Sequence, residues 1–283
     1  MKTSRTLFLA VPLLALFLIT TLFAGCTGGG GGDTNPESLS VTGSTTVLPL
    51  AQKAAEAYMD THQQADIQVS GGGSSVGVQA VGEGTADIGM ASRDLKESEK
   101  QKYPDLVQHV VAKDGIAVIV HPSNTVETVT TAEVKAVYQG TTTNWKEIGG
   151  PDREIVVVGR DSASGTREFF HETVMKKEDF VPTQLEKNSN GAVKQTIAQT
   201  PGAIGYVGLG YVDETVKALK VDVNGTTVKP AVSTVLSGDY PIARSLTMFT
   251  KGEATGLAKE YLDFLLSPEG QAIVEEEGFV PVA

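Results

Sequence analysis

The amino-acid sequence predicts an α/β fold with largely parallel sheets, and three observations support this. Apolar runs of strand length alternate with segments of helical periodicity along the chain. Three of the expected strands run directly into turns of Gly, Ser and Thr, and a helical pattern follows each turn. Of the 283 residues, 258 follow residue 25, a length that suits one large or two medium domains.

The expected strands are short apolar runs, most of them rich in Val and Ile. They span residues 40–42, 67–70, 88–91, 107–112, 116–121, 155–159, 204–207, 219–221 and 246–249. Cap residues and apolar spacing place the main helix starts near Thr45 or Thr46, at Ser74, at Ser164, after the capping box 130–133, near 257 and at 267–269. Ligands of such folds bind at the carboxyl ends of strands, where helices begin.

Three strand-to-helix turns share a composition of glycine and small hydroxyl residues. They are Gly43-Ser44-Thr45-Thr46, Gly71-Gly72-Gly73-Ser74-Ser75 and Ser162-Ala163-Ser164-Gly165-Thr166. A helix start offers unpaired backbone N–H groups and a partial positive charge, and hydroxyls add donors. One such turn alone is more often an ordinary helix cap, but three in one chain favour a site for a small oxyanion. Arg160, just before the third turn, would add a fork of charged donors.

The N-terminus has the pattern of an export signal. Lys2 and Arg5 precede an almost wholly apolar run over residues 7–23, and small residues precede Cys26, the only cysteine. This resembles the lipobox of exported lipoproteins. We therefore expect a signal peptide over residues 1–25, a lipidated Cys26 and a glycine-rich, flexible tether over 26–38. A signal cleaved elsewhere and an uncleaved membrane anchor are the alternatives.

Charge and composition exclude several classes of function. Residues 1–25 contain two basic and no acidic residues, so 21 basic and 34 acidic residues remain, a net charge of −13. Nothing resembles a basic stripe for nucleic acid, and no cluster of Cys or His suggests a metal or cofactor site. Ser162 and Ser164 could suggest a hydrolase, but no histidine is placed as a base, and Gly159 to Gly165 has the wrong spacing for Gly-x-Ser-x-Gly.

Several segments, taken in order, resemble the phosphate-binding proteins of ABC importers, the PstS family. They are 43–46, 72–75, Ala86–Arg93, Asn144–Pro151, 160–166 and 267–270. The resemblance implies a two-lobed periplasmic binding protein fold of type II, hinge-linked, with the ligand in the cleft between the lobes. Lobe one would comprise residues 39–116 and 243–283, and lobe two residues 117–242.

The resemblance also implies a function and a set of site residues. The protein would be a monomer, anchored to the outer face of the cell membrane, that captures inorganic phosphate and delivers it to an ABC permease without catalysis or cofactor. Another oxyanion (sulfate, molybdate or tungstate) and a surface-anchored phosphatase or esterase are the alternatives. The matching positions are Thr45, Thr46, Ser74, Arg93, Arg160, Ser164, Gly165 and Thr166.

One feature of the family is open in this sequence. Better-known members use an Asp to accept the proton that phosphate keeps near neutral pH, and here Arg93 lies at or beside that place. Asp87, Asp94 and Asp161 are the candidate acceptors. A carboxylate would reject fully ionised sulfate, because two acceptors that face each other without a proton are unfavourable. Arginine would instead add attraction and lose that selectivity.

Overall fold

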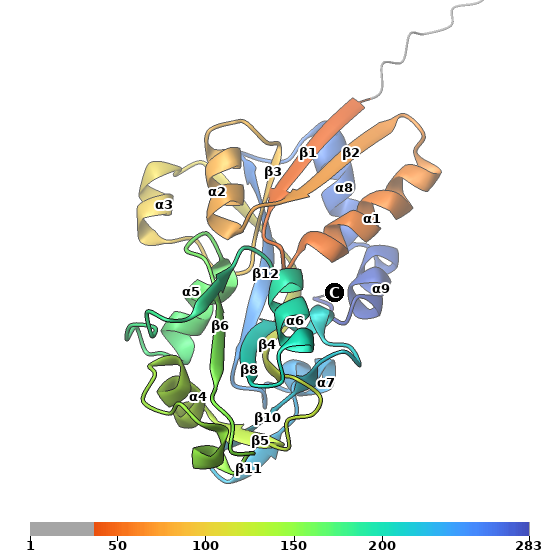
Figure 1. The fold of residues 1–283 in the computed structure, drawn as a ribbon. Coiled ribbons are helices and arrows are strands. Elements are labelled where there is room, and N and C mark those ends of the chain that lie inside the picture. The colour runs from red at the N-terminus through yellow and green to blue at the C-terminus, as the bar shows by residue number, and fades with distance from the viewer. Residues whose placement is uncertain (1–36, 283) are drawn as a thin grey trace, which may run out of the picture. The chain divides into compact units, whose positions relative to one another are not determined.

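One mixed sheet of nine strands organises residues 37–282, the part of the chain that this computed structural model describes (Figure 1). These residues belong to one compact unit that begins at Asn35. The strand order is β2 (Ala65–Gly71), β1 (Glu37–Gly43), β3 (Ile88–Ala91), β12 (Ala243–Lys251), β4 (Leu106–Val120), β8 (Ala203–Gly208), β6 (Val156–Arg160) and β7 (Leu185–Lys187), with β9 (Lys217–Ala218) paired to β4.

The sheet is parallel at both flanks and antiparallel in the centre. β1 pairs in parallel with β2 and β3, and β6 pairs in parallel with β7 and β8. β12 is antiparallel to β3 and β4, and β4 is antiparallel to β8. The expectation of largely parallel sheets is therefore wrong for the centre, because β4 and β12 run in opposite directions there.

The runs 107–112 and 116–121, expected as two strands, form the single strand β4. Asp114 interrupts the apolar pattern, but it lies opposite Arg244 in the register with β12, so the pairing continues through it. A second sheet has the order β11 (Thr226–Val228), β10 (Lys220–Val223) and β5 (Thr128–Thr130). β5, β7 and β11 have three residues each and were not expected, because so short a segment carries no clear periodicity.

The helices connect the strands and follow most of the expected starts. They are α1 (Leu48–Thr61), α2 (Ser74–Gly82), α3 (Glu97–Lys102), α4 (Thr131–Tyr138), α5 (Gly165–Thr173), α6 (Asn190–Gln199), α7 (Val232–Leu236), α8 (Gly256–Leu266) and α9 (Pro268–Glu276), with 3₁₀ turns at Trp145–Ile148 (η1) and Leu209–Tyr211 (η2). Thr130 caps α4 by accepting from Glu133 N at 3.1 Å, as the capping box predicts. α1 begins later than expected, because residues 45–47 form a turn.

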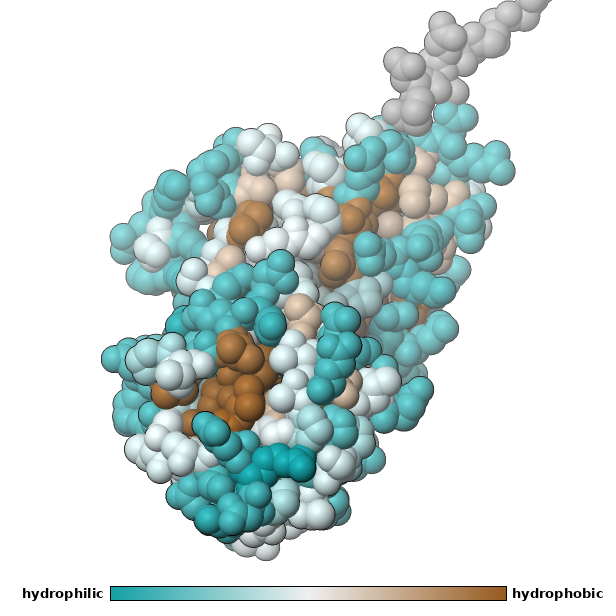
Figure 2. All heavy atoms as spheres, in the orientation of Figure 1, coloured by the Kyte–Doolittle hydropathy of each residue, from teal (hydrophilic) through white to brown (hydrophobic). Residues whose placement is uncertain are grey.

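The hydrophobic core has two main clusters. One draws its buried residues from 39–112 and 246–279, and the other from 116–242 together with Val280. The clusters change over within β4, between Ala112 and Ile116, and again near the start of β12. Figure 2 shows a largely hydrophilic face with an apolar patch near β6. None of the helices within residues 37–282 is long and apolar enough to cross a membrane.

Candidate anion-binding site

The three hydroxyl-rich turns meet in space. The first follows β1 and the second follows β2, and Gly43 and Gly71 are neighbours in the parallel register of these strands. The third follows β6 in the opposite flank of the sheet. Thr46 and Thr166 place their hydroxyl oxygens 3.0 Å apart, so the first and third turns are in hydrogen-bond contact.

Backbone contacts join the second and third turns. Ser75 N donates to Ala163 O at 3.1 Å. A Cβ atom at Gly165 would lie 2.2 Å from Ser74 Oγ, and one at Gly73 would lie 2.6 Å from Ala163 O. Glycine is therefore required at both positions by the close approach of the two turns, as the predicted convergence demands.

Arg160 brings a buried positive charge to this cluster. The residue is 1% exposed. Its Nε donates to Lys187 O at 3.1 Å, and its Nη2 donates to Thr45 Oγ1 and to Asn188 O, both at 3.3 Å. Nη1 is buried and has no hydrogen-bond partner among residues 37–282, and no carboxylate there forms an ion pair with Arg160. Burial lowers the pKa of the Arg160 guanidinium, because removal from water disfavours its charged form.

The serines of the site are buried and have local partners. Ser164 is the N-cap of α5, and its Oγ accepts from Arg167 N at 3.1 Å, which leaves the hydroxyl proton free to donate. Ser74 Oγ accepts from Ser92 N at 3.1 Å and lies 3.4 Å from Ser92 Oγ, where either hydroxyl can be the donor. Ser74 and Ser75 do not cap α2, because Gly73 occupies the N-cap position.

Arg93 differs from Arg160 because acidic side chains surround it. Its two Nη atoms each contact a carboxylate oxygen of Glu99 at 2.7 Å, and its Nε lies 2.9 Å from Glu168 Oε2. Nη2 also donates to Ser75 Oγ at 3.1 Å. The guanidinium therefore lies beside the second turn with its charge compensated, and its role as an anion ligand stays a prediction.

The three candidate proton acceptors occupy unequal positions. Asp87 accepts from both the backbone N and the hydroxyl of Ser40, at 2.8 and 2.6 Å, and Asp94 is exposed. Asp161 is half-buried, and its Oδ1 is buried without a hydrogen-bond partner among the described residues. Of the three, Asp161 is therefore the one with a buried acceptor oxygen that has no partner among the described residues.

Sequence reasoning missed a buried ion pair and an asparagine in this cluster. Arg244 Nη2 donates to Asp114 Oδ2 at 2.8 Å and to Thr46 Oγ1 at 3.2 Å. Asn190 Nδ2 donates to Thr45 Oγ1 at 3.1 Å and to Thr46 Oγ1 at 3.0 Å. The sequence signals for the ion pair were Asp114, between the expected strands 107–112 and 116–121, and Arg244, just before the expected strand 246–249; Asn190 gave no signal.

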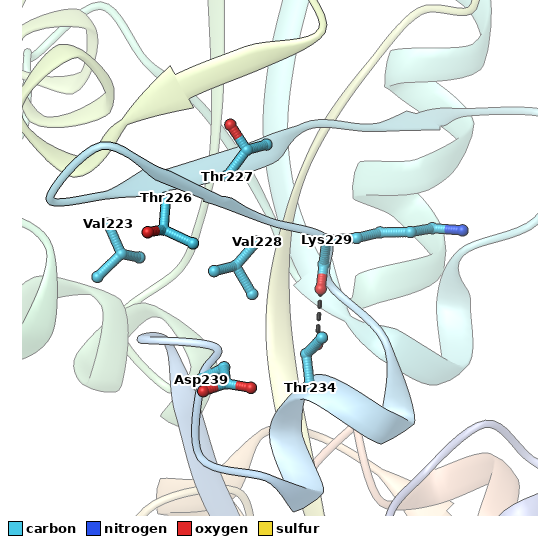
Figure 3. A pocket seen from close by; sticks show the side chains of 7 residues that line it. All are labelled: Val223, Thr226, Thr227, Val228, Lys229, Thr234 and Asp239. Carbon is cyan, nitrogen blue, oxygen red and sulfur yellow. Dashed lines mark hydrogen bonds between the residues drawn. The ribbon is translucent and has the colours of Figure 1, made fainter.

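The four histidines have neighbours that do not belong to the cluster. His109 contacts the hydroxyl of Thr250, and His121 contacts that of Ser123. His62 stacks on Tyr58, and His171 lies near Phe180. Among residues 37–282 no group of His, Cys, Asp or Glu is arranged to hold a metal ion. The surface pocket in Figure 3 is lined by Val223, Thr226, Thr227, Val228, Lys229, Thr234 and Asp239, none of which belongs to the cluster. Cys26, the expected signal peptide and all but the last two residues of the expected tether lie outside the described residues.

Comparisons with known proteins identify the family of this chain. The PBP superfamily domain matches residues 29–269. Phosphate-binding protein PstS of Bacillus subtilis is 42% identical over 247 residues, which are 87% of this chain and 81% of the relative. PstS of Staphylococcus epidermidis is 30% identical, with 92% of this chain and 85% of the relative covered.

Solved structures give the same result. A putative phosphate ABC transporter substrate-binding protein from Clostridium perfringens, solved with bound phosphate, is 40% identical with a TM-score of 0.83 and covers 87% of this chain and 100% of its own. An ABC-type phosphate transport receptor from Vibrio cholerae is 32% identical with a TM-score of 0.70, covering 86% and 99%. The fold is therefore that of the periplasmic binding proteins, and the chain belongs to the PBP superfamily and, within it, to the PstS family of phosphate-binding proteins.

Proposed function

We propose that this protein captures inorganic phosphate outside the cytoplasm and delivers it to the permease of an ABC importer. The observation that carries the proposal is the buried guanidinium of Arg160, whose Nη1 lacks a partner among residues 37–282 and which lies beside hydroxyls from the converging turns. A tetrahedral oxyanion supplies the acceptors and the negative charge that such a group requires. The relatives from Bacillus subtilis and Staphylococcus epidermidis are named for phosphate binding.

The proposed ligands are the eight positions that the sequence suggested. Thr45, Thr46, Ser74, Ser164, Gly165 and Thr166 would donate hydrogen bonds, and Arg160 would pair with the anion. Arg93 would act from the margin of the site, because Glu99 and Glu168 already neutralise its charge. Asp161 is the carboxylate best suited to accept a phosphate proton, since its buried Oδ1 has no partner in the described part of the chain.

Capture would use two lobes, residues 39–116 with 243–283 and residues 117–242. The two core clusters support this division, because they change over at nearly the same points of the chain. Contacts between Thr46 and Thr166 and between Ser75 and Ala163 would then form across the cleft as it closes. The mature protein would be a monomer held at the membrane through a lipid on Cys26, which the lipobox-like sequence supports.

Titration of the purified protein with phosphate, sulfate, molybdate and tungstate across pH tests the ligand. We expect phosphate to bind most tightly, and a dependence on its protonation state would reveal a carboxylate acceptor. Tighter binding of another oxyanion would identify that ion, rather than phosphate, as the ligand. Binding of none would overturn the proposal. The chain is not an enzyme, in keeping with relatives named as binding proteins and a transport receptor.

A further inference from the structure

Asn190 connects two elements of the site from a fully buried position. It is the first residue of α6, and Ser189 provides the cap of that helix by accepting from Ala192 N at 3.1 Å. The side chain of Asn190 is therefore not needed for capping. It reaches the first turn, 144 residues away in the sequence, and contacts the hydroxyls of Thr45 and Thr46.

The orientation of the Asn190 amide is fixed by its other end. Gly208 N donates to Oδ1 at 3.3 Å, so a flipped amide would place its NH₂ group against another N–H donor. Nδ2 must therefore face the threonines. Its two hydrogens are directed to the two hydroxyl oxygens, one to each, at 3.1 and 3.0 Å.

These bonds saturate the acceptor capacity of both hydroxyls. A hydroxyl oxygen has two lone pairs and one proton. Besides the amide, Thr45 Oγ1 accepts from Arg160 Nη2 at 3.3 Å and from the backbone N of Asn190 at 3.4 Å. Thr46 Oγ1 accepts from Arg244 Nη2 at 3.2 Å. None of these nitrogen groups can accept in return. Each threonine must therefore use its own proton as a donor, as Thr46 does here toward Thr166 at 3.0 Å.

We propose that Asn190 is a positioning residue that fixes the hydroxyls of Thr45 and Thr46 as hydrogen-bond donors to the bound oxyanion. This inference rests on the proposed function, because it assumes that the two threonines contact the ligand. Without the amide, Thr46 Oγ1 has a free lone pair and can rotate to accept from a neighbour, and Thr45 Oγ1 keeps only its two longer contacts, with Arg160 Nη2 at 3.3 Å and with the backbone N of residue 190 at 3.4 Å. The donors would then have to be reoriented when the anion binds, which lowers the affinity.

A double-mutant cycle on the full-length protein tests whether Asn190 acts through the threonines. We expect Asn190→Ala to raise the Kd for inorganic phosphate by about 10- to 100-fold, the scale of one or two hydrogen bonds. The same substitution in a Thr45→Val or a Thr46→Val background should raise the Kd by a clearly smaller factor, because part of its target is gone. The free energy of unfolding, measured by denaturation, separates this effect from loss of stability.

Asn124→Ala is the matched control. Asn124 is also a buried asparagine, 3% exposed, and its Oδ1 accepts from Val126 N at 2.9 Å, so its loss lowers stability without touching the cluster. Its Kd should equal that of the unmodified protein. An unchanged Kd for Asn190→Ala, or an equal factor in all three backgrounds, would overturn the positioning role alone. Failure of the unmodified protein to bind any oxyanion would overturn the proposed function and this inference with it.

Discussion

Arg244 and Asp114 form a fully buried ion pair between the two antiparallel central strands, with Nη2 2.8 Å and Nε 3.1 Å from the same carboxylate oxygen. They are direct neighbours in the register of β12 and β4. The other carboxylate oxygen accepts from Leu209 N at 2.9 Å, and Arg244 Nη1 donates to Ser92 O at 3.0 Å. The pair thus joins the two strands that connect the core clusters. Arg244 Nη2 also donates to Thr46 Oγ1 at 3.2 Å, so the pair contacts the first turn of the site.

Removal of one partner of this pair should be strongly destabilising. Asp114→Asn leaves Arg244 buried without a counter-charge, and we expect the free energy of unfolding to fall by about 3–5 kcal/mol. The double variant Asp114→Asn with Arg244→Met should recover part of this loss, because no unpaired charge remains. Urea denaturation of the three proteins measures both effects.

The exposed pair Lys259–Asp263 on α8 is the control for that experiment. Both side chains are well exposed, and surface pairs of this kind contribute about 0–1 kcal/mol. Asp263→Asn should therefore leave the unfolding midpoint nearly unchanged. Equal losses for Asp114→Asn and Asp263→Asn would contradict the assigned importance of the buried pair.

Arg160→Ala should weaken phosphate binding by about 1.5–3 kcal/mol or more, the scale of a hydrogen bond to a charged group. This corresponds to roughly a 10- to 150-fold rise in Kd. Isothermal titration calorimetry measures it. Arg93→Ala is the comparison, since Glu99 and Glu168 already compensate that guanidinium, and we expect a smaller rise. An unchanged affinity in the Arg160 variant would exclude its role in charge pairing.

Gly165→Ala should disrupt the meeting of the second and third turns. The new Cβ would lie 2.2 Å from Ser74 Oγ and 3.0 Å from Ser92 Oγ, so the turns must separate. Such overpacking costs about 1–3 kcal/mol, and phosphate affinity should fall by a comparable amount if closure forms the site. Binding and denaturation measurements on the same protein report the two effects.

Gly191→Ala provides the matched substitution on α6. Its nearest contact would be Tyr211 Cε1 at 4.0 Å, so the methyl group fits. We expect the same Kd as the unmodified protein and a free energy of unfolding that is equal or up to about 1 kcal/mol higher. If both glycine variants bind phosphate normally, the close contact at Gly165 is not needed for binding.

Stability should fall on acidification in part through His109. Burial lowers the pKa of this imidazole below its ordinary value of 6.5, an effect that the carboxylate of Glu253 partly opposes. Below pH 6.5 the unfolded chain therefore binds more protons at this position than the folded one, so protonation favours unfolding. The loss begins as the pH falls through 6.5 and stops below the folded pKa.

Denaturation of the His109→Gln variant and of the unmodified protein tests this contribution of His109. We choose about pH 5 to 7, because histidine titrates in that range. The variant should show a weaker dependence of unfolding free energy on pH than the unmodified protein. Thr250 Oγ1, 2.9 Å from His109 Nε2, can still find a partner in glutamine, so the comparison isolates the titration. Parallel pH profiles would show that His109 does not contribute.

Local signals in the sequence were enough to predict the ends of many elements. Thr130 with Glu133 predicted the start of α4, and Ser267 before Pro268 predicted that of α9, because a cap depends on residues three positions apart. The three Gly, Ser and Thr turns were also visible, and the structure brings them together. Strand directions were not visible, because an apolar run is the same in parallel and antiparallel pairs.

The sequence by itself determined the α/β alternation, the three turns rich in donors and the resemblance to the phosphate-binding family, since each is written in short segments. Only the tertiary structure decided which distant side chains meet. It gave Arg93 two carboxylate partners, left Arg160 without one among residues 37–282, and brought Asn190 to Thr45 and Thr46. The physical reason is that these partners come from separate elements, so strand register and the packing of helices, rather than local pattern, set the charge and hydrogen bonding of the site.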